Sequence, residues 1–301
     1  MFIVYCDVSR IFDHLTTLER RKKMSENGKC YLVATPIGNL EDISYRAVRI
    51  LKEVDMIACE DTRNTIKLLN HYNIKSKMIS YHQHNEKMRS EYLCQLIQEG
   101  KNIAIVSDAG MPGISDPGVT MVQACIERNI TVEIVPGASA SISALVLSGL
   151  DTTSFYFKGF LSTNKKIRRE ELAKLRFLEC TLILYEAPHK LLETLEDLQE
   201  HLGDRKISIA RELTKLHQEV IHGHISRGIE HFRQKEPRGE FVLVVEGHIP
   251  EIEEHNWKNI SLEEHFEFYI NKGIDRKEAI KLIAKDRELP KREIYEQLMK
   301  K

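Results

Sequence analysis

The chain has 301 residues, of which 42% are hydrophobic and 30% are charged. This composition is typical of a folded globular protein of about two domains, and it excludes wholesale disorder. The formal net charge of −1 excludes a uniformly cationic surface for nucleic-acid binding, although local basic patches remain compatible with it.

The sequence also argues against membrane insertion and against a metal or disulfide framework. No apolar run approaches the roughly 18 residues that a membrane helix needs, and the first residues lack the basic region of a signal peptide. The six cysteines are scattered and form no C-x-x-C pair. We therefore expect reduced thiols, a cytoplasmic location and no bound metal.

The first 28 residues do not share the pattern of the rest of the chain. The run Glu-Arg-Arg-Lys-Lys at 19–23 leads directly into Met24, and purine-only codons, as in a ribosome-binding site, can encode it. We interpret Met24 as the true start and residues 1–28 as an N-terminal extension, of which 1–23 are mis-called or not native. The alternative is a short basic helix that belongs to the protein.

From residue 29, short β-branched runs alternate with stretches of helical period, which predicts βαβ units on a parallel sheet. We expect strands at 31–34, 56–59, 103–106 and 132–135 and helices at about 44–52 and 140–149, in a first α/β domain over residues 29–150. Further strands at 155–157, 181–185, 207–210 and 241–245 predict a second α/β domain over residues 151–250. Residues 251–301 then form an acidic linker and a basic helical module.

Strands of the first domain end in unusual polar or Gly/Pro turns. Ligands of open α/β sheets bind beyond the carboxyl ends of the strands, so we expect a cleft there. The loop 107–118 holds three glycines, two prolines and two aspartates, which predicts a rigid backbone surface that a ligand can approach closely. The Pro-Gly pair at 136–137 opens a helix whose N-terminal amides suit an anionic group.

Several of these segments closely resemble the bacterial 16S ribosomal RNA cytidine 2′-O-ribose methyltransferase family. This family belongs to the tetrapyrrole methylase superfamily, the class III S-adenosylmethionine methyltransferases. The resemblance covers residues 28–247 and is carried by seven motifs, which lie at 35–40, 58–63, 107–118, 135–137, 185–189, 210–215 and 238–241.

This resemblance implies two α/β domains with the methyl donor, S-adenosylmethionine, in the cleft between them, and a homodimer. It also implies 2′-O-methylation of a cytidine in the decoding region of 16S rRNA within the small ribosomal subunit. Carried over by motif, the donor site comprises Ile37, Ser107, Asp108, Ala109, Ser139, Ala140, Glu186, Ala210, Gly239 and Glu240.

Two clusters of charged residues at strand ends are candidates for catalysis. A ribose 2′-hydroxyl is a poor nucleophile, so positioning should supply most of the rate, with help from a base that accepts the proton. A carboxylate can act as that base while a guanidinium holds a phosphate. The candidates are Glu60, Asp61 and Arg63 in one domain and Arg211 and Glu212 in the other. The alternative is a helix cap with surface ion pairs, and the sequence does not identify the base.

A basic segment between 158 and 176 is a candidate RNA-binding surface. Its density of charge suits contact with phosphates, although a charge run can also be a solvated face. The candidate residues are Lys165, Lys166, Arg168, Arg169 and Arg176. The C-terminal segment has apolar residues at helical spacing from Ala279 to Ala284 and resembles the helix-turn-helix-like module of the same family. A helical cap that packs on the dimer is its alternative.

Two other functions remain open at this point. An enzyme with the same fold and donor could methylate a corrin or porphyrin precursor, although the Thr-Pro-Ile-Gly-Asn turn and the Ser-Asp-Ala-Gly loop depart from that pattern. A ribosome assembly factor that binds RNA without turnover is the other possibility. The two histidines at 82 and 84 do not share a helix face and have no evident third ligand, so we interpret 81–86 as a substrate-facing loop or as solvated surface.

Overall fold

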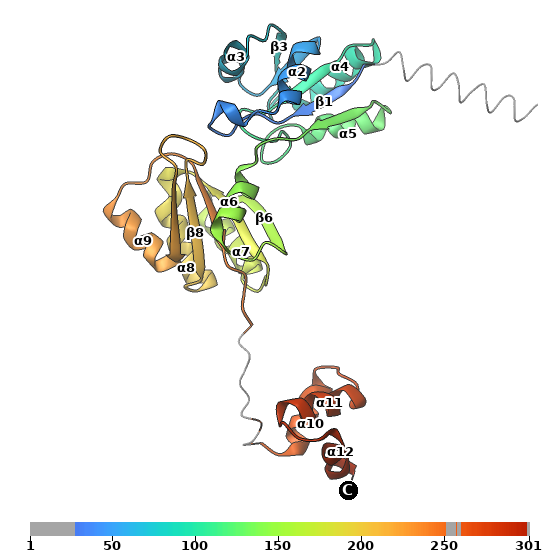
Figure 1. Cartoon of the computed structure of the whole chain (residues 1–301), viewed down its shortest axis with the longest axis vertical. Coiled ribbons are helices and arrows are strands. Elements are labelled where there is room, and N and C mark those ends of the chain that lie inside the picture. Colours follow the sequence, from blue (N-terminus) through green and yellow to red (C-terminus); the bar gives the residue numbers. More distant parts are fainter. Residues whose placement is uncertain (1–27, 251–256, 258–259, 300–301) are drawn as a thin grey trace, which may run out of the picture. The chain divides into compact units, whose positions relative to one another are not determined.

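The computed structural model describes residues 28–250, 257 and 260–299. The expected N-terminal extension, as far as residue 27, and most of the acidic linker lie outside the described residues. One compact unit of the chain ends at His248, and a second begins at Ile249. Figure 1 labels the elements of both units.

The first half of the larger unit is built on a parallel sheet of five strands, in the order β3-β2-β4-β1-β5. The strands are β1 (Cys30–Val33), β2 (Met56–Cys59), β3 (Lys77–Ser80), β4 (Ile103–Val106) and β5 (Val132–Val135). Four of them match the predicted strands. The sequence analysis missed β3, a half-exposed edge strand.

Helices cover both faces of this sheet, which explains why its central strands are apolar throughout. One face packs against α2 (Tyr45–Glu53) and α3 (Thr62–His71), through Leu51 and Leu69 among others. The other face packs against α4 (Glu86–Gln98) and α5 (Val119–Glu127), through Leu93 and Met121 among others. A short 3-10 helix, η1 (Leu40–Asp42), precedes α2.

The second half is a mixed sheet with the strand order β6-β7-β10-β8-β9. Its strands are β6 (Phe155–Phe160), β7 (Thr181–Glu186), β8 (Lys206–Arg211), β9 (Glu219–His224) and β10 (Phe241–Val245). Only β6 and β7 pair in parallel; the other neighbours are antiparallel. The edge strand β9 was not predicted. Two sheets with flanking helices confirm the predicted α/β fold class.

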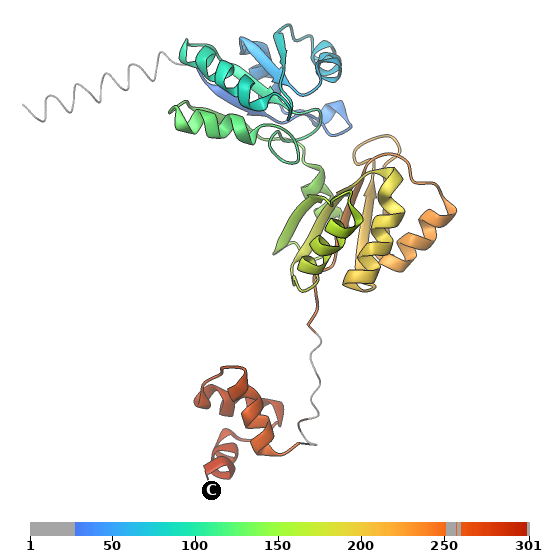
Figure 2. The same ribbon diagram turned by 180° about the vertical axis from the view of Figure 1, so that it is seen from behind.

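The two faces of the second sheet are covered by different parts of the chain. On one face, α7 (Lys165–Leu175), α8 (Leu191–Leu202) and α9 (Ile225–Gln234) form a large apolar core with the sheet, and Figure 2 shows these yellow to orange helices in front of the strands. The short 3-10 helix η2 (Pro188–Lys190) precedes α8. The opposite face packs against α6 (Ala140–Ser148), in front of the sheet in Figure 1, through Ala144 and Leu145. By its packing α6 therefore belongs with the second sheet, although it precedes residue 150, where the sequence suggested a domain boundary.

The smaller unit contains α10 (Leu262–Asn271), α11 (Arg276–Asp286) and α12 (Lys291–Met299). Ser261 and Glu264 form a capping box at the start of α10, since each side chain accepts the other residue's backbone N–H. Leu262, Ile280, Ile283 and Ile294 form its buried core. The predicted apolar stripe of the C-terminal segment is thus the inner face of α11.

Candidate active site

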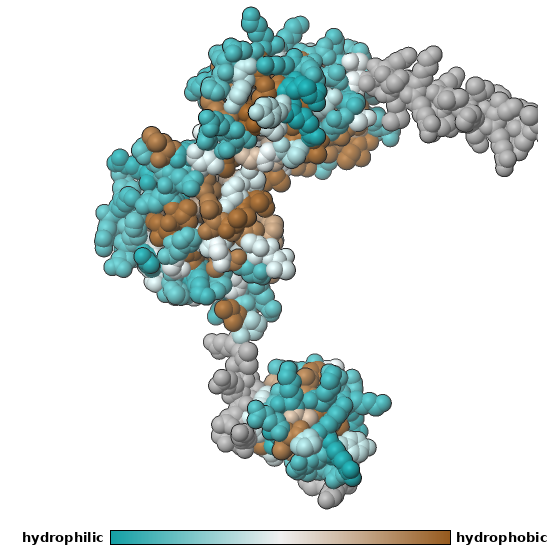
Figure 3. Space-filling model, in the orientation of Figure 1, coloured by the Kyte–Doolittle hydropathy of each residue, from teal (hydrophilic) through white to brown (hydrophobic). Residues whose placement is uncertain are grey.

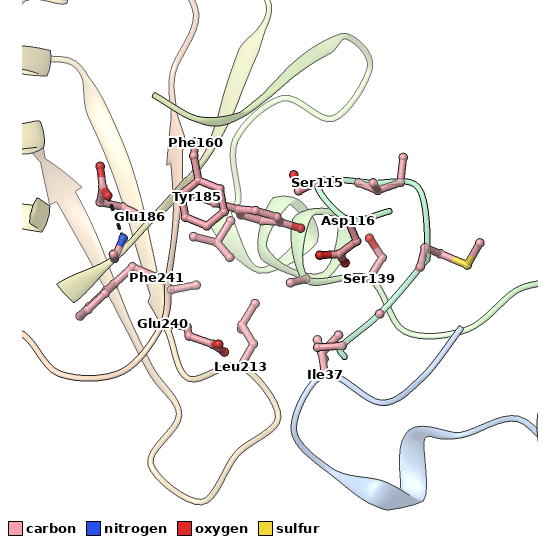
Figure 4. Close-up of a pocket in the computed structure, with 18 of the residues that line it drawn as sticks. Ile37, Ser115, Asp116, Ser139, Phe160, Tyr185, Glu186, Leu213, Glu240 and Phe241 are labelled. Carbon is pink, nitrogen blue, oxygen red and sulfur yellow. Dashed lines mark hydrogen bonds between the residues drawn. The ribbon is translucent and has the colours of Figure 1, made fainter. Parts of the chain in front are cut away.

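A cavity of about 360 Å³ lies between the two halves of the larger unit. This volume falls within the range of pockets that bind small molecules and cofactors. Its walls come from the first turn, the loop after β4, the start of α6 and the ends of the second-sheet strands (Figure 4). Seven of the ten predicted donor-binding residues line it: Ile37, Ala109, Ser139, Ala140, Glu186, Ala210 and Glu240.

The other three predicted donor residues do not line the cavity, and Ser107 and Asp108 make hydrogen bonds that fix the loop after β4. The Ser107 hydroxyl donates to the carbonyl of Gly110 at 3.2 Å, and the Thr35 hydroxyl donates to the Ser107 carbonyl. Asp108 accepts hydrogen bonds from the Asp61 amide at 3.1 Å and the Asn64 side-chain amide at 2.9 Å, which ties the loop to the end of β2. Gly239 has a φ of +88°, and a Cβ there would lie 2.5 Å from Cγ of Glu212.

The loop after β4 is fixed to the first turn by main-chain hydrogen bonds. Thr35 and Gly110 form an isolated antiparallel bridge, with N–H to carbonyl distances of 2.9 and 3.1 Å. Gly110 has a φ of +80°, a conformation that side chains other than glycine rarely adopt. The glycine-rich sequence therefore builds a rigid main-chain wall, as predicted.

The second sheet contributes an aromatic wall. Tyr185 at the end of β7 makes edge contacts with Phe157 and Phe160 of β6, with ring centroids 5.1 and 5.6 Å apart. Both Tyr185 and Phe160 line the cavity. Burial raises the pKa of the Tyr185 hydroxyl, so the phenol stays neutral. A flat aromatic or apolar group of a ligand has a suitable surface here.

One carboxyl group, that of Asp116, lies on the first-sheet side of the cavity, with the charges of Glu60 and Asp108 near it. Asp116 lines the cavity. Its pKa is raised to about 7, mainly by burial and also by the nearby charges of Glu60 and Asp108. Burial, together with the charge of Asp108, also raises the pKa of Glu60. The sequence predicts that the loop 107–118 binds a ligand, but it does not single out Asp116, because nothing in the pattern distinguishes Asp116 from Asp108.

None of the five predicted catalytic residues lines the cavity. Asp61 caps α3 and pairs with Arg63, whose Nη2 lies 2.7 Å from Oδ2; hydrogen bonds from Arg63 lower the pKa of Asp61 to about 2. The Arg63 side chain is 87% exposed. Glu60 follows β2 and is half-buried. The contacts of Glu60, Asp61 and Arg63 are therefore compatible with both hypotheses from the sequence. Asp61 caps a helix and forms an ion pair, and the Arg63 guanidinium is also exposed to a ligand.

The set on the second sheet is held more tightly. Arg211 Nε donates to the Arg238 carbonyl at 2.6 Å, and its Nη1 lies 3.2 Å from Glu219. Glu212, with a φ of +50°, accepts from the Lys215 ammonium at 2.9 Å. Lys215 also binds Glu240 at 2.8 Å, so this network supports the cavity wall. For Arg211 and Glu212 these contacts favour the structural alternative.

The candidate RNA-binding residues differ in their exposure. Lys165, Lys166 and Arg176 are exposed. The Arg169 guanidinium forms an ion pair with Glu200, with 2.8 Å between Nη2 and Oε2. Arg168 is a correction: its side chain is only 2% exposed and pairs with Asp197 at 2.6 Å and Glu193 at 2.5 Å, so it joins α7 to α8 and is not accessible to phosphate.

Groups of potential metal ligands are few among the described residues. Across the described part of the chain, one group of residues, Asp197, Glu200 and His201, brings three candidate ligand atoms within 4.8 Å of one another. Asp197 is already neutralised by Arg168, and we assign no metal to the group. The rings of His82 and His84 lie 5.8 Å apart, and within the described residues no third candidate ligand joins them. No helix within the described residues is both long and apolar enough to cross a membrane.

Comparisons with known proteins place this chain in a family. The model of the Tetrapyrrole (Corrin/Porphyrin) Methylases matches residues 29–227. The chain is 47% identical over 283 residues to a ribosomal RNA small subunit methyltransferase I of Halalkalibacterium halodurans, and the match covers 93% of this chain and 98% of the relative. It is 48% identical over 284 residues to the protein of the same name from Bacillus subtilis, with 92% of this chain and 97% of the relative covered.

Solved structures support the same fold at lower identity. The uroporphyrin-III C-methyltransferase of Thermus thermophilus complexed with S-adenyl homocysteine is 18% identical, with a TM-score of 0.52, and the match covers 73% of this chain and 97% of that one. The fold is shared, and the family resemblance predicted from the motifs is confirmed. The chain belongs to the ribosomal RNA small subunit methyltransferase I family, within the tetrapyrrole methylases.

Proposed function

We propose that the protein transfers a methyl group from S-adenosylmethionine to the 2′-oxygen of a cytidine in the decoding region of 16S rRNA, within the small ribosomal subunit. It is an S-adenosylmethionine-dependent rRNA methyltransferase, as the names of its close relatives imply. The observation that carries the proposal is the cavity whose walls hold seven of the residues expected from the motifs. The rRNA substrate and the scattered free cysteines favour a cytoplasmic location.

The cavity suits the donor in size, shape and charge. Main-chain atoms of the loop after β4 and the apolar Ile37 and Ala210 form one part of the wall, and Tyr185 offers an aromatic face to the adenosine. When bound, S-adenosylmethionine supplies a methyl group on a positively charged sulfur. The carboxyl of Asp116 gives the wall the opposite charge. Ser107 and Asp108 contribute by holding the loop after β4, and Gly239 leaves space for the Glu212 side chain.

Catalysis then depends on how the protein holds the target ribose. The exposed Arg63 guanidinium can hold a phosphate of the RNA, and Asp61 fixes its direction through a two-point contact. Glu60, Arg211 and Glu212 shape the charge and the loop around the reaction centre. Positioning of this kind accounts for much of the rate of a transfer from an already activated methyl group.

Methyl transfer from labelled donor tests this function. Purified small ribosomal subunits from a strain without the enzyme should become labelled, and a corrin or porphyrin precursor should not. Label in the corrin or porphyrin precursor alone would show that the protein methylates tetrapyrroles and would contradict the proposed function. Subunit binding without any transfer would support the assembly-factor alternative.

The basic start of α7 is proposed to contact RNA phosphates. Replacing Lys165 and Lys166 together with Gln should weaken binding to small subunits and reduce the slope of log affinity against log salt by about one to two units, because fewer counterions are released. Filter binding over a range of salt concentrations measures both. The matched control is the pair Lys75→Gln, just before the edge strand β3, and Lys77→Gln, at its first residue. An unchanged slope would mean that the basic start of α7 is a solvated surface that does not contact RNA.

We also propose that the protein is a homodimer. Exposed apolar residues gather around α6 and the free edges of both sheets, as the brown area of the larger unit shows in Figure 3. They are Ile134, Ile142, Val146, Leu147, Phe155 and Tyr156. Val146 is 68% exposed, which is unusual for a valine beside other apolar side chains. A second copy would cover this surface together with β5 and β6, one edge strand of each sheet.

A charge on α6 tests the dimer. Val146→Glu should convert a dimer of about twice the chain mass into a monomer, because an interface that buries an unpaired carboxylate loses affinity. Light scattering coupled to gel filtration measures the mass. Met88→Glu, at an equally exposed apolar residue of α4, should leave the dimer intact. A monomeric wild type would contradict the proposal.

A further inference from the structure

Three carboxyl groups line the cavity, and two of them already have partners. Glu186 is buried and accepts hydrogen bonds from its neighbour's amide, Ala187, at 2.8 Å and from the Thr194 hydroxyl at 2.6 Å. Glu240 pairs with Lys215. Within residues 28–250, burial and the charges of Glu60 and Asp108 are what act on the Asp116 carboxyl, and no cation or side-chain hydrogen bond is among them. Asp116 is therefore the wall carboxyl that is available to a substrate.

The backbone holds Asp116 in place. Gly113 donates from its amide to the Pro117 carbonyl at 3.1 Å, which closes the tip of the loop around Asp116. Ser115, with a φ of +62°, packs against Gly159 of β6, where an added Cβ would lie 3.2 Å from the Ser115 hydroxyl. Figure 4 shows the Asp116 carboxyl directed into the pocket, toward the side chains of Tyr185 and Ser139.

The surrounding groups set the proton affinity of Asp116. Glu60 at the end of β2 and Asp108 in the same loop are the charges that act on it, and Tyr185 faces it from β7. His82 acts on Glu60 and not on Asp116. With its pKa at about 7, the carboxyl exchanges its proton near neutral pH, where a general base is most effective.

We propose that Asp116 is the proton acceptor of the methyl transfer. The ribose 2′-oxygen forms its bond to the methyl carbon while the bond from that carbon to sulfur breaks. The electron pair of the broken bond stays on sulfur, which becomes a neutral thioether, and the hydroxyl proton passes to the Asp116 carboxylate. This inference rests on the proposed function, because it names the base for that reaction.

The proposed position of the Asp116 carboxyl should also affect the binding of the donor, which can be measured without turnover. A carboxylate that reaches the attacking oxygen must also lie within several ångströms of the sulfonium, whose positive charge stabilises the carboxylate. Binding of S-adenosylmethionine at pH 7 should therefore release a fraction of a proton from Asp116. S-adenosylhomocysteine has the same amino-acid end but a neutral sulfur, and it should release much less.

Calorimetry in buffers of different ionisation enthalpy measures this proton release. Wild-type protein should release more protons with S-adenosylmethionine than with S-adenosylhomocysteine, and Asp116→Asn should abolish the difference. S-adenosylhomocysteine affinity should stay within about twofold of wild type. Equal release by wild type and Asp116→Asn would overturn the proposal, and so would a large loss of S-adenosylhomocysteine affinity, which would make Asp116 a donor-binding residue.

Turnover on small subunits provides the second measurement. Asp116→Asn should lower the single-turnover rate by about 100-fold or more, as expected for loss of a general base. The wild-type rate should rise with pH up to the pKa of Asp116 and then level off, and the residual rate of the Asn variant should lack that rise. Asp116→Glu should recover part of the rate together with its pH dependence. Glu91→Gln, an exposed carboxyl of α4, is the control.

These measurements distinguish three failures: of the proposed function, of Asp116 as the base, and of folding in the variant. A wild-type protein that methylates no RNA contradicts the function, whereas an active wild type with a fully active Asp116→Asn contradicts only the base. Because burial raises the pKa of Asp116, its charged form is unfavourable in the folded state above pH 7. The Asn variant should therefore unfold at the same or a higher temperature than wild type at pH 8.

Discussion

Replacing Ala109 with Trp should abolish donor binding, with a loss of affinity of at least about 100-fold. Ala109 lines the cavity, yet its side chain is exposed, so an indole can enter the empty volume without displacing the core. A side chain of that size fills much of a cavity of about 360 Å³ and excludes the donor sterically. Isothermal titration with S-adenosylhomocysteine measures the loss.

The same experiment includes its own check on folding. The thermal midpoint of Ala109→Trp should lie close to that of wild type, because the substitution removes no buried contact. Ala173→Trp, at an exposed alanine of α7, should bind the donor normally. Normal donor binding by Ala109→Trp would mean that the donor occupies some other site, and the assignment of the cavity would fail.

Replacing Arg63 with Ala should lower the rate of methyl transfer by about 100-fold or more, because a small misplacement of the target ribose has an effect of that size. The side chain is 87% exposed and, among the described residues, its ion-pair partner is Asp61 at the surface, so its loss should have little effect on stability. Single-turnover transfer to small subunits measures the rate, and calorimetry should find unchanged donor affinity.

Two variants distinguish a phosphate-binding Arg63 from a structural one. Arg63→Lys should recover only part of the rate, since an ammonium restores the charge without the two-point geometry of a guanidinium. Arg211→Ala should instead lower the thermal midpoint, because it removes contacts to the Arg238 carbonyl and to Glu219. If Arg63→Ala lowers the thermal midpoint in the same way, Arg63 serves the fold and not the substrate.

The sequence predicted the interior strands well and the edge strands poorly. β4 is buried along its whole length, so its apolar run is unambiguous. β3 and β9 lie at sheet edges and carry Lys77 and His222 among half-exposed residues, so no apolar pattern marks them. The packing of α6 was also beyond the sequence, because its small residues suit either sheet.

For the site, the sequence predicted where the cavity lies better than it predicted what each side chain does. Seven of the ten motif residues line the cavity. The Ser107 hydroxyl instead bonds to the nearby Gly110 carbonyl, and Asp108 accepts from the Asp61 amide, which only the fold brings near. Arg168 failed as an RNA contact because Asp197, 29 positions away, lies opposite it on α8. Charge patterns along one helix do not reveal the partner helix.

The central claim is tested most directly by the identity of the methylated nucleoside. Small subunits from a strain without the enzyme are incubated with the protein and S-adenosylmethionine, and the 16S rRNA is digested to nucleosides and to mapped fragments for mass spectrometry. The proposed function predicts 2′-O-methylcytidine at one position in the decoding region, and none with Ala109→Trp. A methyl group on a base, or on a nucleotide outside the decoding region, would contradict it.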